Sequence, residues 1–255
     1  MIGYNRLGIN GRLCNQMFQY ASLRGIAAKH GYDFCIPPRD RETYDMADYI
    51  LMDGFKLPHA KNIGYIPEDR PIHDEPSHDF DLELFENCPD NINLEGFRQS
   101  EKYFKHIEKE IREDFTFNDE IVQDCNEIMS EVGDAIFIHI RRGDYVATPN
   151  HHPVLPIEYY EEGLKRFDPD IPVLVFSDAL DWVREQKLFD GDRFLVAEGN
   201  VNYVDLCLMT LCSGHIIANS SFSWWGAWLS NSEKVIAPKN WFSGHLEDQD
   251  TKDLY

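Results

Sequence analysis

The chain has 255 residues, enough to bury the core of one large α/β domain or of two smaller ones. It carries 24 Lys and Arg against 45 Asp and Glu, a formal net charge of −21, which argues against a nucleic-acid-binding protein and against general electrostatic attachment to anionic lipid. Hydrophobic residues at 43% and aromatic residues at 13% are typical of a globular protein and exclude disorder for most of the chain.

The first half of the chain predicts few regular elements. Residues 2–9 fit a strand, and residues 15–31 predict a helix that ends at Gly31, a residue type that closes helices in a left-handed conformation. Residues 36–95 are rich in Pro, Asp and His and predict long loops with short pieces of structure. Residues 100–131 predict two amphipathic helices that lead into the second half.

The second half predicts strands that alternate with helices. Five short apolar runs predict strands, at 135–140, 173–178, 193–197, 214–219 and 233–238. Four segments between or after them predict helices, at 156–167, 179–189, 202–212 and 221–230. This alternation indicates a parallel sheet covered on both faces, a Rossmann-like doubly wound unit in which ligands bind at the carboxyl ends of the strands. The change of pattern near residue 133 predicts two lobes with a cleft between them.

The cysteines and the N-terminus indicate the compartment. The chain contains no C-x-x-C pair, and its cysteines predict buried thiols in a reducing compartment. Their even number leaves disulfide bridges open as the alternative. The six cysteines are Cys14, Cys35, Cys88, Cys125, Cys207 and Cys212. The N-terminus has no apolar core of a signal peptide, and no run approaches the roughly 18 apolar residues of a membrane span. We therefore expect a cytoplasmic protein with no integral membrane segment.

The segment HIRRGDY, residues 139–145, lies at the end of a predicted buried strand. Arg141 and Arg142 are the only Lys or Arg residues between Arg112 and Lys165, and a guanidinium pair at the end of a parallel strand suits a phosphate or a diphosphate. Asp144 is placed to orient one of the arginines. A single arginine here would more often pair with surface carboxylates, whereas the adjacent pair favours ligand binding.

Two further segments place polar residues at a predicted helix start. In GRLCNQMFQYA, residues 11–21, a glycine turn leads into a helix whose unpaired N–H groups could hold a phosphate or sugar oxygen, although Asn15 is also an ordinary capping residue and capping is the simpler interpretation. In ANSSFSWWGAWLS, residues 218–230, Ser220 and Ser221 could cap the helix or donate to a phosphate. Trp224 and Trp228 lie four residues apart on one face, which favours core packing over sugar stacking.

Common cofactor motifs do not occur in the sequence. It has no G-x-x-x-x-G-K-[ST], G-x-G-x-x-G, H-E-x-x-H or G-x-S-x-G string. D-x-D strings, which could hold a divalent metal, occur about as often as chance predicts, at 79–81, 168–170, 190–192 and 248–250. None follows a predicted core strand with other ligands nearby, so we expect no metal site.

Together the three segments resemble the α-1,2-fucosyltransferases, glycosyltransferase family 11. GRLCNQMFQYA, HIRRGDY and NSSFSWWGAWL stand in the order in which the family carries its corresponding motifs, and the resemblance spans residues 8 to about 242. Cys14 stands where the family usually has a glycine, the residue type best suited to a left-handed turn. Residues 40–100 match no motif, and acceptor choice is expected there.

The resemblance implies an α/β, GT-B-like fold of two lobes. Residues 1–133 would form the lobe on the acceptor side, residues 134–240 the Rossmann-like lobe for the nucleotide-sugar donor, and residues 241–255 a tail that returns to the first lobe. The implied reaction is inverting transfer of L-fucose from GDP-β-L-fucose to the 2-hydroxyl of a terminal β-galactoside, without a metal or other cofactor. The partners are therefore the donor and a β-galactoside-containing glycan.

The resemblance also implies roles for particular residues. Arg141 would neutralise the leaving GDP, with His139 near the ribose or phosphate and Arg142 holding the local geometry. Asp205 occupies the position that reads guanine and Ser221 the position that touches phosphate. The remaining expected donor contacts are Arg12, Asn15, Gln16 and Ser220.

The general base and the acceptor stay open at this point. His151 and His152, in the Pro-rich loop 146–156, are candidates because imidazole titrates near neutral pH, although two adjacent loop histidines are as often solvated surface. Asp144 is a further candidate and is better explained by a structural role. The alternatives for the whole chain are a fucosyltransferase of another linkage or acceptor, such as α-1,6 transfer to an amino sugar, and a GDP-sugar-binding protein without catalysis.

Overall fold

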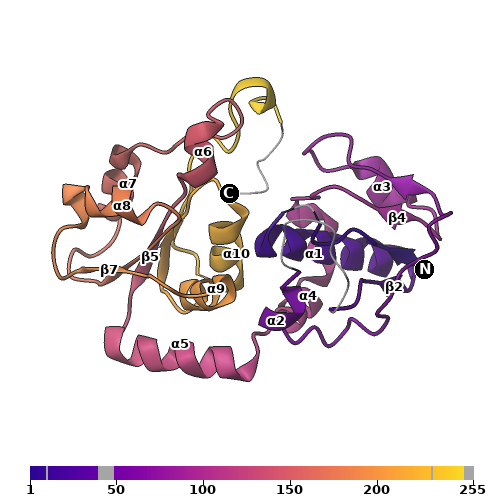
Figure 1. Cartoon of the computed structure of the whole chain (residues 1–255), viewed down its shortest axis with the longest axis horizontal. Coiled ribbons are helices and arrows are strands. Elements are labelled where there is room, and N and C mark those ends of the chain that lie inside the picture. The colour runs from indigo at the N-terminus through magenta and orange to yellow at the C-terminus, as the bar shows by residue number, and fades with distance from the viewer. Residues whose placement is uncertain (10, 40–48, 231, 250–255) are drawn as a thin grey trace. The chain divides into compact units, whose positions relative to one another are not determined.

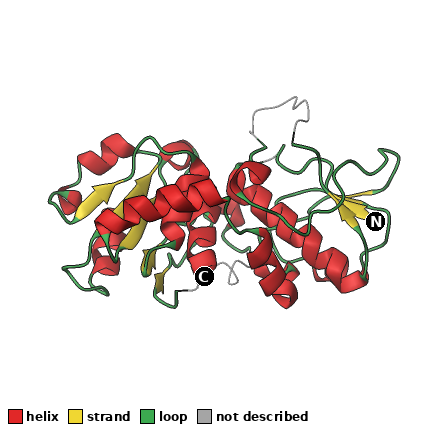
Figure 2. Ribbon diagram, turned by 90° about the horizontal axis from the view of Figure 1, so that it is seen from below, coloured by secondary structure: helices red, strands yellow, loops and turns green. Residues whose placement is uncertain are grey.

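The computed structural model describes residues 1–9, 11–39, 49–230 and 232–249. The chain forms two compact units: unit 1 comprises Met1–Asn118 and Gln249, and unit 2 comprises Asp119–Asp248. Each unit has its own parallel sheet and its own helices, labelled in Figure 1 and coloured by type in Figure 2.

Unit 1 contains a four-stranded parallel sheet in the order β2-β1-β4-β3. Its strands are only two residues long: β1 (Ile2–Gly3), β2 (Phe34–Cys35), β3 (Ile72–His73) and β4 (Asn93–Leu94). Its helices and 3-10 turns are α1 (Leu13–His30), α2 (Leu51–Gly54), α3 (Leu82–Asn87), η1 (Glu101–Tyr103), η2 (Lys105–Ile107) and α4 (Glu108–Asp114). Such short strands agree with the composition of residues 36–95, which predicts long loops with short pieces of structure.

The helix α1 ends as its sequence predicts. Gly31 adopts a left-handed conformation, with φ of 68°, and its N–H donates to the carbonyls of Ala27 and Ala28. Most of the helix surface is buried, which explains why apolar residues occur on all of its faces. The strand expected over residues 2–9 is shorter, because the chain turns after Gly3, where Leu7 N donates to the Tyr4 carbonyl.

Unit 2 contains a five-stranded parallel sheet in the order β7-β6-β5-β8-β9, which confirms the predicted doubly wound unit. The strands are β5 (Ile136–Ile140), β6 (Val173–Ser177), β7 (Phe194–Val196), β8 (Gly214–Ile216) and β9 (Val235–Ile236). The helices and the 3-10 turns are α5 (Asp119–Val132), α6 (Gly143–Ala147), α7 (Ile157–Leu164), α8 (Leu180–Arg184), η3 (Lys187–Phe189), α9 (Asn202–Thr210), α10 (Ser221–Ser230) and η4 (Gly244–Leu246). The helix expected over residues 179–189 is divided into α8 and η3, and α6 is an element that the sequence did not predict.

Helices cover both faces of this sheet. Alternate residues of β5, Ile136 and Ile138 among them, join a core cluster with Tyr160 of α7 and Val183 of α8. The intervening residues point to the opposite face, where His139 contacts α10. Side chains alternate between the two faces of a strand, and all five residues of β5 are buried, so this strand is covered on both sides.

The strand order creates a switch point between β5 and β8. From β5 the chain adds β6 and then β7 on one side, and it later adds β8 and β9 on the other side. In open α/β sheets, ligands bind at the carboxyl ends of the strands where the order reverses. The segments after β5 and β8 are HIRRGDY and NSSFSWWGAWL, so the sheet brings two of the three sequence motifs to this point.

The limits of the two units differ from the lobes expected from the sequence. The helix α5 packs on α9 and thus belongs to unit 2, although the expected boundary near residue 133 assigns it to the first lobe. In the tail, the side chain of Gln249 accepts a hydrogen bond from His78 N at 3.0 Å within unit 1. The rest of the expected tail, residues 250–255, lies outside the described residues, as do residues 40–48 of the expected acceptor region.

All six cysteines are buried free thiols, as the sequence predicts. Among the described residues, none of the helices combines the length and the apolar character that crossing a membrane requires.

Candidate functional site

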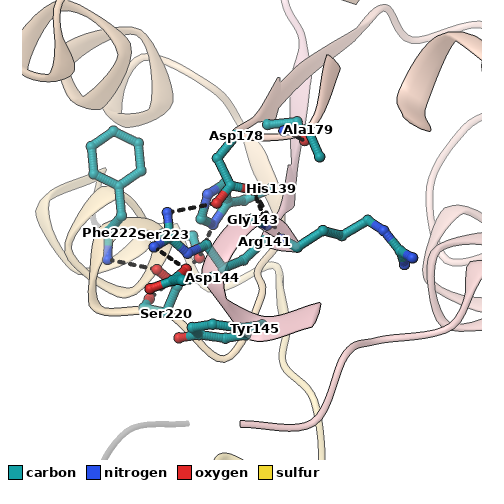
Figure 3. A network of polar contacts seen from close by, with 12 residues as sticks. His139, Arg141, Gly143, Asp144, Tyr145, Asp178, Ala179, Ser220, Phe222 and Ser223 are labelled. Atoms are coloured by element: carbon teal, nitrogen blue, oxygen red, sulfur yellow. Dashed lines mark hydrogen bonds and ion pairs between the residues drawn. The ribbon is translucent and has the colours of Figure 1, made fainter. Parts of the chain in front are cut away.

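Arg141 lies directly after β5, and carboxylates contact both ends of its guanidinium group. Its Nη2 lies 2.5 Å from Oδ1 of Asp144, and its Nη1 lies 2.8 Å from Oδ2 of Asp178 (Figure 3). The Arg141 side chain is 17% exposed, so it is mostly buried yet reaches solvent at the end of the sheet. The contact between Asp144 and an arginine that the sequence predicts is therefore present.

Asp178 follows β6, the neighbour of β5, and fixes the backbone after β5. Because Ile140 pairs with Ser177, the next residues, Arg141 and Asp178, leave the two strands side by side. Oδ1 of Asp178 accepts hydrogen bonds from Arg142 N at 2.9 Å and Gly143 N at 3.2 Å. A Cβ atom at Gly143 would lie 2.5 Å from Oδ2 of Asp178, so a larger residue here would displace that carboxylate.

Sequence analysis missed Asp178, although a signal for it was present. Asp178 ends the run VLVFSD, so it is an acidic residue at the carboxyl end of a core strand. The arginines were singled out for the same placement. Because parallel strands bring their carboxyl ends to one edge of the sheet, Asp178 is expected at the same edge as the arginines.

The two adjacent arginines have different surroundings. The guanidinium carbon of Arg142 lies 4.1 Å from the ring centroid of Trp182 on α8, a cation–π contact. The guanidinium carbon of Arg141 lies 5.4 Å from the ring centroid of Tyr145. The pair is therefore split: Arg141 belongs to the carboxylate cluster, and Arg142 packs on an aromatic ring.

His139 lies inside the unit, beneath the end of β5. It is 5% exposed, and its Nδ1 lies 2.9 Å from Oγ of Ser223 on α10. Burial, followed by the positive charge of Arg141, lowers the pKa of His139 to about 3. The imidazole is therefore neutral near pH 7 and joins β5 to α10.

Tyr145 and Asn219 connect the segments that follow β5 and β8. The Tyr145 hydroxyl donates to the Asn219 carbonyl at 2.8 Å, and Nδ2 of Asn219 donates to the carbonyls of Pro153 and Trp241, both at 3.1 Å. Both Tyr145 and Asn219 are buried. Their hydrogen bonds hold the loop after α6 and the start of the tail against the end of the sheet.

The start of α10 contains the two serines expected to cap the helix or touch a phosphate. Ser220 precedes the helix, and its Oγ accepts a long hydrogen bond from Phe222 N at 3.4 Å, as a cap does. Ser221, the first helical residue, is half-buried. Trp224 is buried and its ring stacks on that of Trp228, with centroids 6.2 Å apart, which agrees with packing rather than with an open sugar platform.

Asp205 lies in the first turn of α9 and is half-buried. Its Oδ1 accepts a hydrogen bond from Nδ2 of Asn200 at 2.9 Å, and burial raises the pKa of Asp205. A carboxylate that is partly desolvated and still reachable could accept hydrogen bonds from a base edge.

The two loop histidines differ in burial. The ring of His152 stacks on Tyr145 with centroids 4.3 Å apart and planes 9° apart, and it also contacts Phe242 at 5.2 Å. His151 is exposed, and its ring meets that of His245 at 4.8 Å, edge to face. The structure thus gives one histidine a packing role and leaves the other open to solvent.

The expected donor contacts of the first motif lie in unit 1, where α1 begins differently from the sequence interpretation. The capping position is Arg12, which is exposed, so the interpretation of Asn15 as the cap is wrong. Asn15 lies within the first turn, and its Oδ1 accepts from Nε2 of Gln99 at 2.8 Å. Gln16 is fully buried, and its Oε1 accepts from Ile50 N at 3.2 Å.

Cys14 does not interrupt the turn before α1. It is buried inside the helix, and the left-handed residue is Gly11, with φ of 91°. A Cβ atom at Gly11 would collide with the Asn15 side chain. The glycine that this turn requires is therefore Gly11, which the chain retains, and the left-handed geometry is kept despite Cys14.

A search for clusters of three or more His, Cys, Asp or Glu side chains that could hold a metal finds none within the described parts of the chain.

Comparison with solved structures shows the fold. NodZ α-1,6-fucosyltransferase soaked with GDP-fucose matches 93% of this chain and 94% of its own, with a TM-score of 0.58 at 14% sequence identity. POFUT1 in complex with GDP matches 92% of this chain and 96% of its own, with a TM-score of 0.59 at 13% identity. The chain therefore has the GT-B-like fold of these fucosyltransferases.

Comparison of sequences shows the family. Residues 1–254 match the profile of glycosyl transferase family 11, and the chain belongs to this family of enzymes. Alpha-1,2-colitosyltransferase of Escherichia coli is 31% identical over 263 residues, which cover 91% of this chain and 90% of that protein. Galactoside alpha-(1,2)-fucosyltransferase 1 of Homo sapiens is 25% identical over 89% of this chain and 65% of its own length. O-antigen biosynthesis glycosyltransferase WbnK of Escherichia coli is 34% identical over 55% of this chain and 52% of its own length.

Proposed function

We propose that the protein transfers L-fucose from GDP-β-L-fucose to the 2-hydroxyl of a terminal β-galactoside, with inversion and without a bound metal. The observation that carries this proposal is Arg141, a mostly buried guanidinium at the carboxyl end of β5, beside the switch point of a family 11 sheet. The structure supports the placement, and the family supports the chemistry.

The chemistry requires a fixed positive group at the leaving diphosphate. The oxygen of the galactoside 2-hydroxyl attacks C1 of fucose, the bond from C1 to the β-phosphate oxygen breaks, and the electron pair leaves with GDP. Negative charge grows on the β-phosphate, and Arg141 can donate to it from a site where Asp178 already fixes its direction. The start of α10, with Ser220 and Ser221, offers further donors to a phosphate.

The other expected donor contacts fit separate roles. Asp205 is assigned to the guanine, because its partly buried carboxylate can accept from N–H groups. Arg142 and His139 are assigned to holding the end of β5, since one packs on Trp182 and the other is a buried neutral ring. In unit 1, Asn15 and Gln16 make internal contacts, so exposed Arg12 is the residue there that we assign to the donor.

The proton of the attacking hydroxyl needs a base. His151 exposes its ring, whereas the His152 ring packs on Tyr145 and Phe242, and the Asp144 carboxylate contacts Arg141. We therefore assign the base to His151, since histidine is the side chain that most often acts as a general base in enzymes.

The names of relatives support the α-1,2 linkage and point to two candidate donor sugars, which an experiment must distinguish. One relative is named a colitosyltransferase and another a galactoside fucosyltransferase, both of α-1,2 linkage. Colitose is fucose without its 3-hydroxyl, so GDP-colitose is a second candidate donor.

The test is transfer by the purified protein with GDP-fucose or GDP-colitose and a lactose-type acceptor, in excess EDTA. GDP release should accompany a product whose NMR spectrum shows an α-1,2 linkage. Preference for GDP-colitose would show that the proposed donor sugar is wrong. A product with another linkage would show that the proposed acceptor hydroxyl is wrong, and loss of activity in EDTA would overturn metal independence. Binding of GDP without turnover over a broad acceptor panel would overturn the transfer itself.

A further inference from the structure

The two carboxylates that contact Arg141 are attached to the protein in different ways. Asp178 binds Arg141 through Oδ2 and accepts the N–H groups of Arg142 and Gly143 through Oδ1. Asp144 contacts Arg141 through Oδ1, and in the part of the chain that the structure describes its carboxylate has no further hydrogen-bonding partner. Asp178 is therefore held by three groups and Asp144 by one.

The exposure of the two side chains follows the same division. Asp178 is 23% exposed, and its Oδ2 lies close enough to Gly143 that a Cβ atom there would be 2.5 Å away. Asp144 is 60% exposed and lies in the first turn of the short helix α6. Rotation of the Asp144 side chain into solvent would break a single ion pair, and exposed pairs of this kind contribute little.

Resting on the proposed function, we propose that Asp144 is an exchangeable partner of Arg141, which the diphosphate of the donor replaces, whereas Asp178 is a permanent positioning residue. Nη2 of Arg141 is the end that Asp144 occupies, so it is the end that becomes available to phosphate oxygens. A diphosphate beside Asp144 repels that carboxylate, and the guanidinium keeps an anionic partner throughout the exchange.

The proposal predicts opposite effects of two matched substitutions on the binding of GDP. Asp144→Asn removes the competing charge and should lower the Kd for GDP by about two- to fivefold, the range of an exposed ion pair. Asp178→Asn loosens Arg141 and should raise the Kd and lower kcat. Calorimetric titration of the full-length variants with GDP measures both Kd values.

A control separates the exchange from a change of net charge. Asp181→Asn removes the same charge from another Asp–Arg pair three residues apart, in which Asp181 lies 3.3 Å from Arg184 and is 98% exposed. It should leave the Kd unchanged. In an Arg141→Ala background, Asp144→Asn should also lose its effect, because the guanidinium for which carboxylate and phosphate compete is absent.

The outcomes are distinct from those for the proposed function. Unchanged or weaker GDP binding by Asp144→Asn overturns the exchange. If the wild-type protein binds no GDP, the proposed donor is wrong, and the exchange is then read from the rate at which phenylglyoxal modifies Arg141, followed by peptide mass spectrometry. Faster modification in Asp144→Asn than in wild type supports a loosely held partner, and an equal or slower rate overturns it.

Discussion

The hydroxyl of Tyr145 donates a hydrogen bond to the main-chain carbonyl of Asn219 across 2.8 Å, joining the segment after β5 to the segment after β8. The two residues are 74 positions apart in the chain and meet only because β5 and β8 are neighbours at the switch point. Arg141 lies next to this connection, with its guanidinium over the Tyr145 ring. The geometry of the candidate site therefore depends on a buried phenol.

Tyr145→Phe tests this dependence. The change leaves the buried Asn219 carbonyl without its donor, which should lower the free energy of unfolding by about 1–2 kcal/mol and lower kcat as well. Tyr159→Phe is the control, since its hydroxyl donates to the carbonyls of Ile217 and Ile236 in the same unit. Urea unfolding should show comparable losses for both, and kcat should fall only for Tyr145→Phe; equal kcat values would show that the connection does not affect the site.

The two arginines should respond unequally to substitution. Arg141→Ala removes a fixed donor to the leaving diphosphate and should reduce kcat by about a hundred- to a thousandfold. Arg142→Ala should cost much less, and Trp182→Ala should reproduce its effect, because the two side chains form one stacked contact. Steady-state kinetics on the three variants measures this, and a larger loss for Arg142→Ala than for Arg141→Ala would reverse the assignment.

Gly143→Ala should impair the site without removing any polar group. The added methyl group would meet Oδ2 of Asp178 at 2.5 Å and force that carboxylate away from Arg141. Misplacement of a catalytic group by about 1 Å costs on the order of 10²-fold in rate. If kcat falls through Asp178, Gly143→Ala should add little in an Asp178→Asn background; additive losses would place its effect elsewhere.

The buried His139 predicts how stability changes with pH. Its pKa is about 3 in the folded protein against an ordinary value of 6.5, so between these values the unfolded chain binds a proton that the folded chain does not. Stability should therefore fall as the pH decreases through this window, by up to about 1.4 kcal/mol per pH unit for this group. Comparison of urea unfolding between pH 4 and 7 should show a shallower slope for His139→Gln than for wild type; identical slopes would contradict the burial of a neutral ring.

The sequence predicts the sheet of unit 2 and most of its candidate site because both depend on local pattern. Apolar runs identify β5, β6 and β8, and the polar segments after β5 and β8 carry Arg141 and Ser220. The end of a predicted strand could have placed Asp178 at this edge of the sheet, but its contact with Arg141 depends on the pairing of Ile140 with Ser177, a register that is set by tertiary packing. The two adjacent arginines look equivalent in the sequence, and only Asp178 and Trp182 make them different.

The local sequence pattern was less informative about the boundary between the two units and about the start of α1, because packing decides both. The apolar stripe of α5 predicts that one face is covered, but it does not say that α9 covers it, and so the unit boundary could not be derived. Asn15 is a good capping residue in isolation, yet the helix begins earlier, at Leu13, after the left-handed Gly11. Helix ends depend on such backbone turns, which one residue type seldom identifies.

His151 should be the histidine whose loss removes base catalysis. A general base contributes about 10²- to 10⁴-fold to the rate, so His151→Ala should lower kcat by a factor in this range. His152→Phe keeps an aromatic ring against Tyr145 and Phe242 and should retain kcat. His245→Ala removes only the ring that meets His151 edge to face and should also retain kcat. Steady-state kinetics on the three variants measures this, and a loss of kcat in His152→Phe together with an unchanged kcat in His151→Ala would transfer the role to His152.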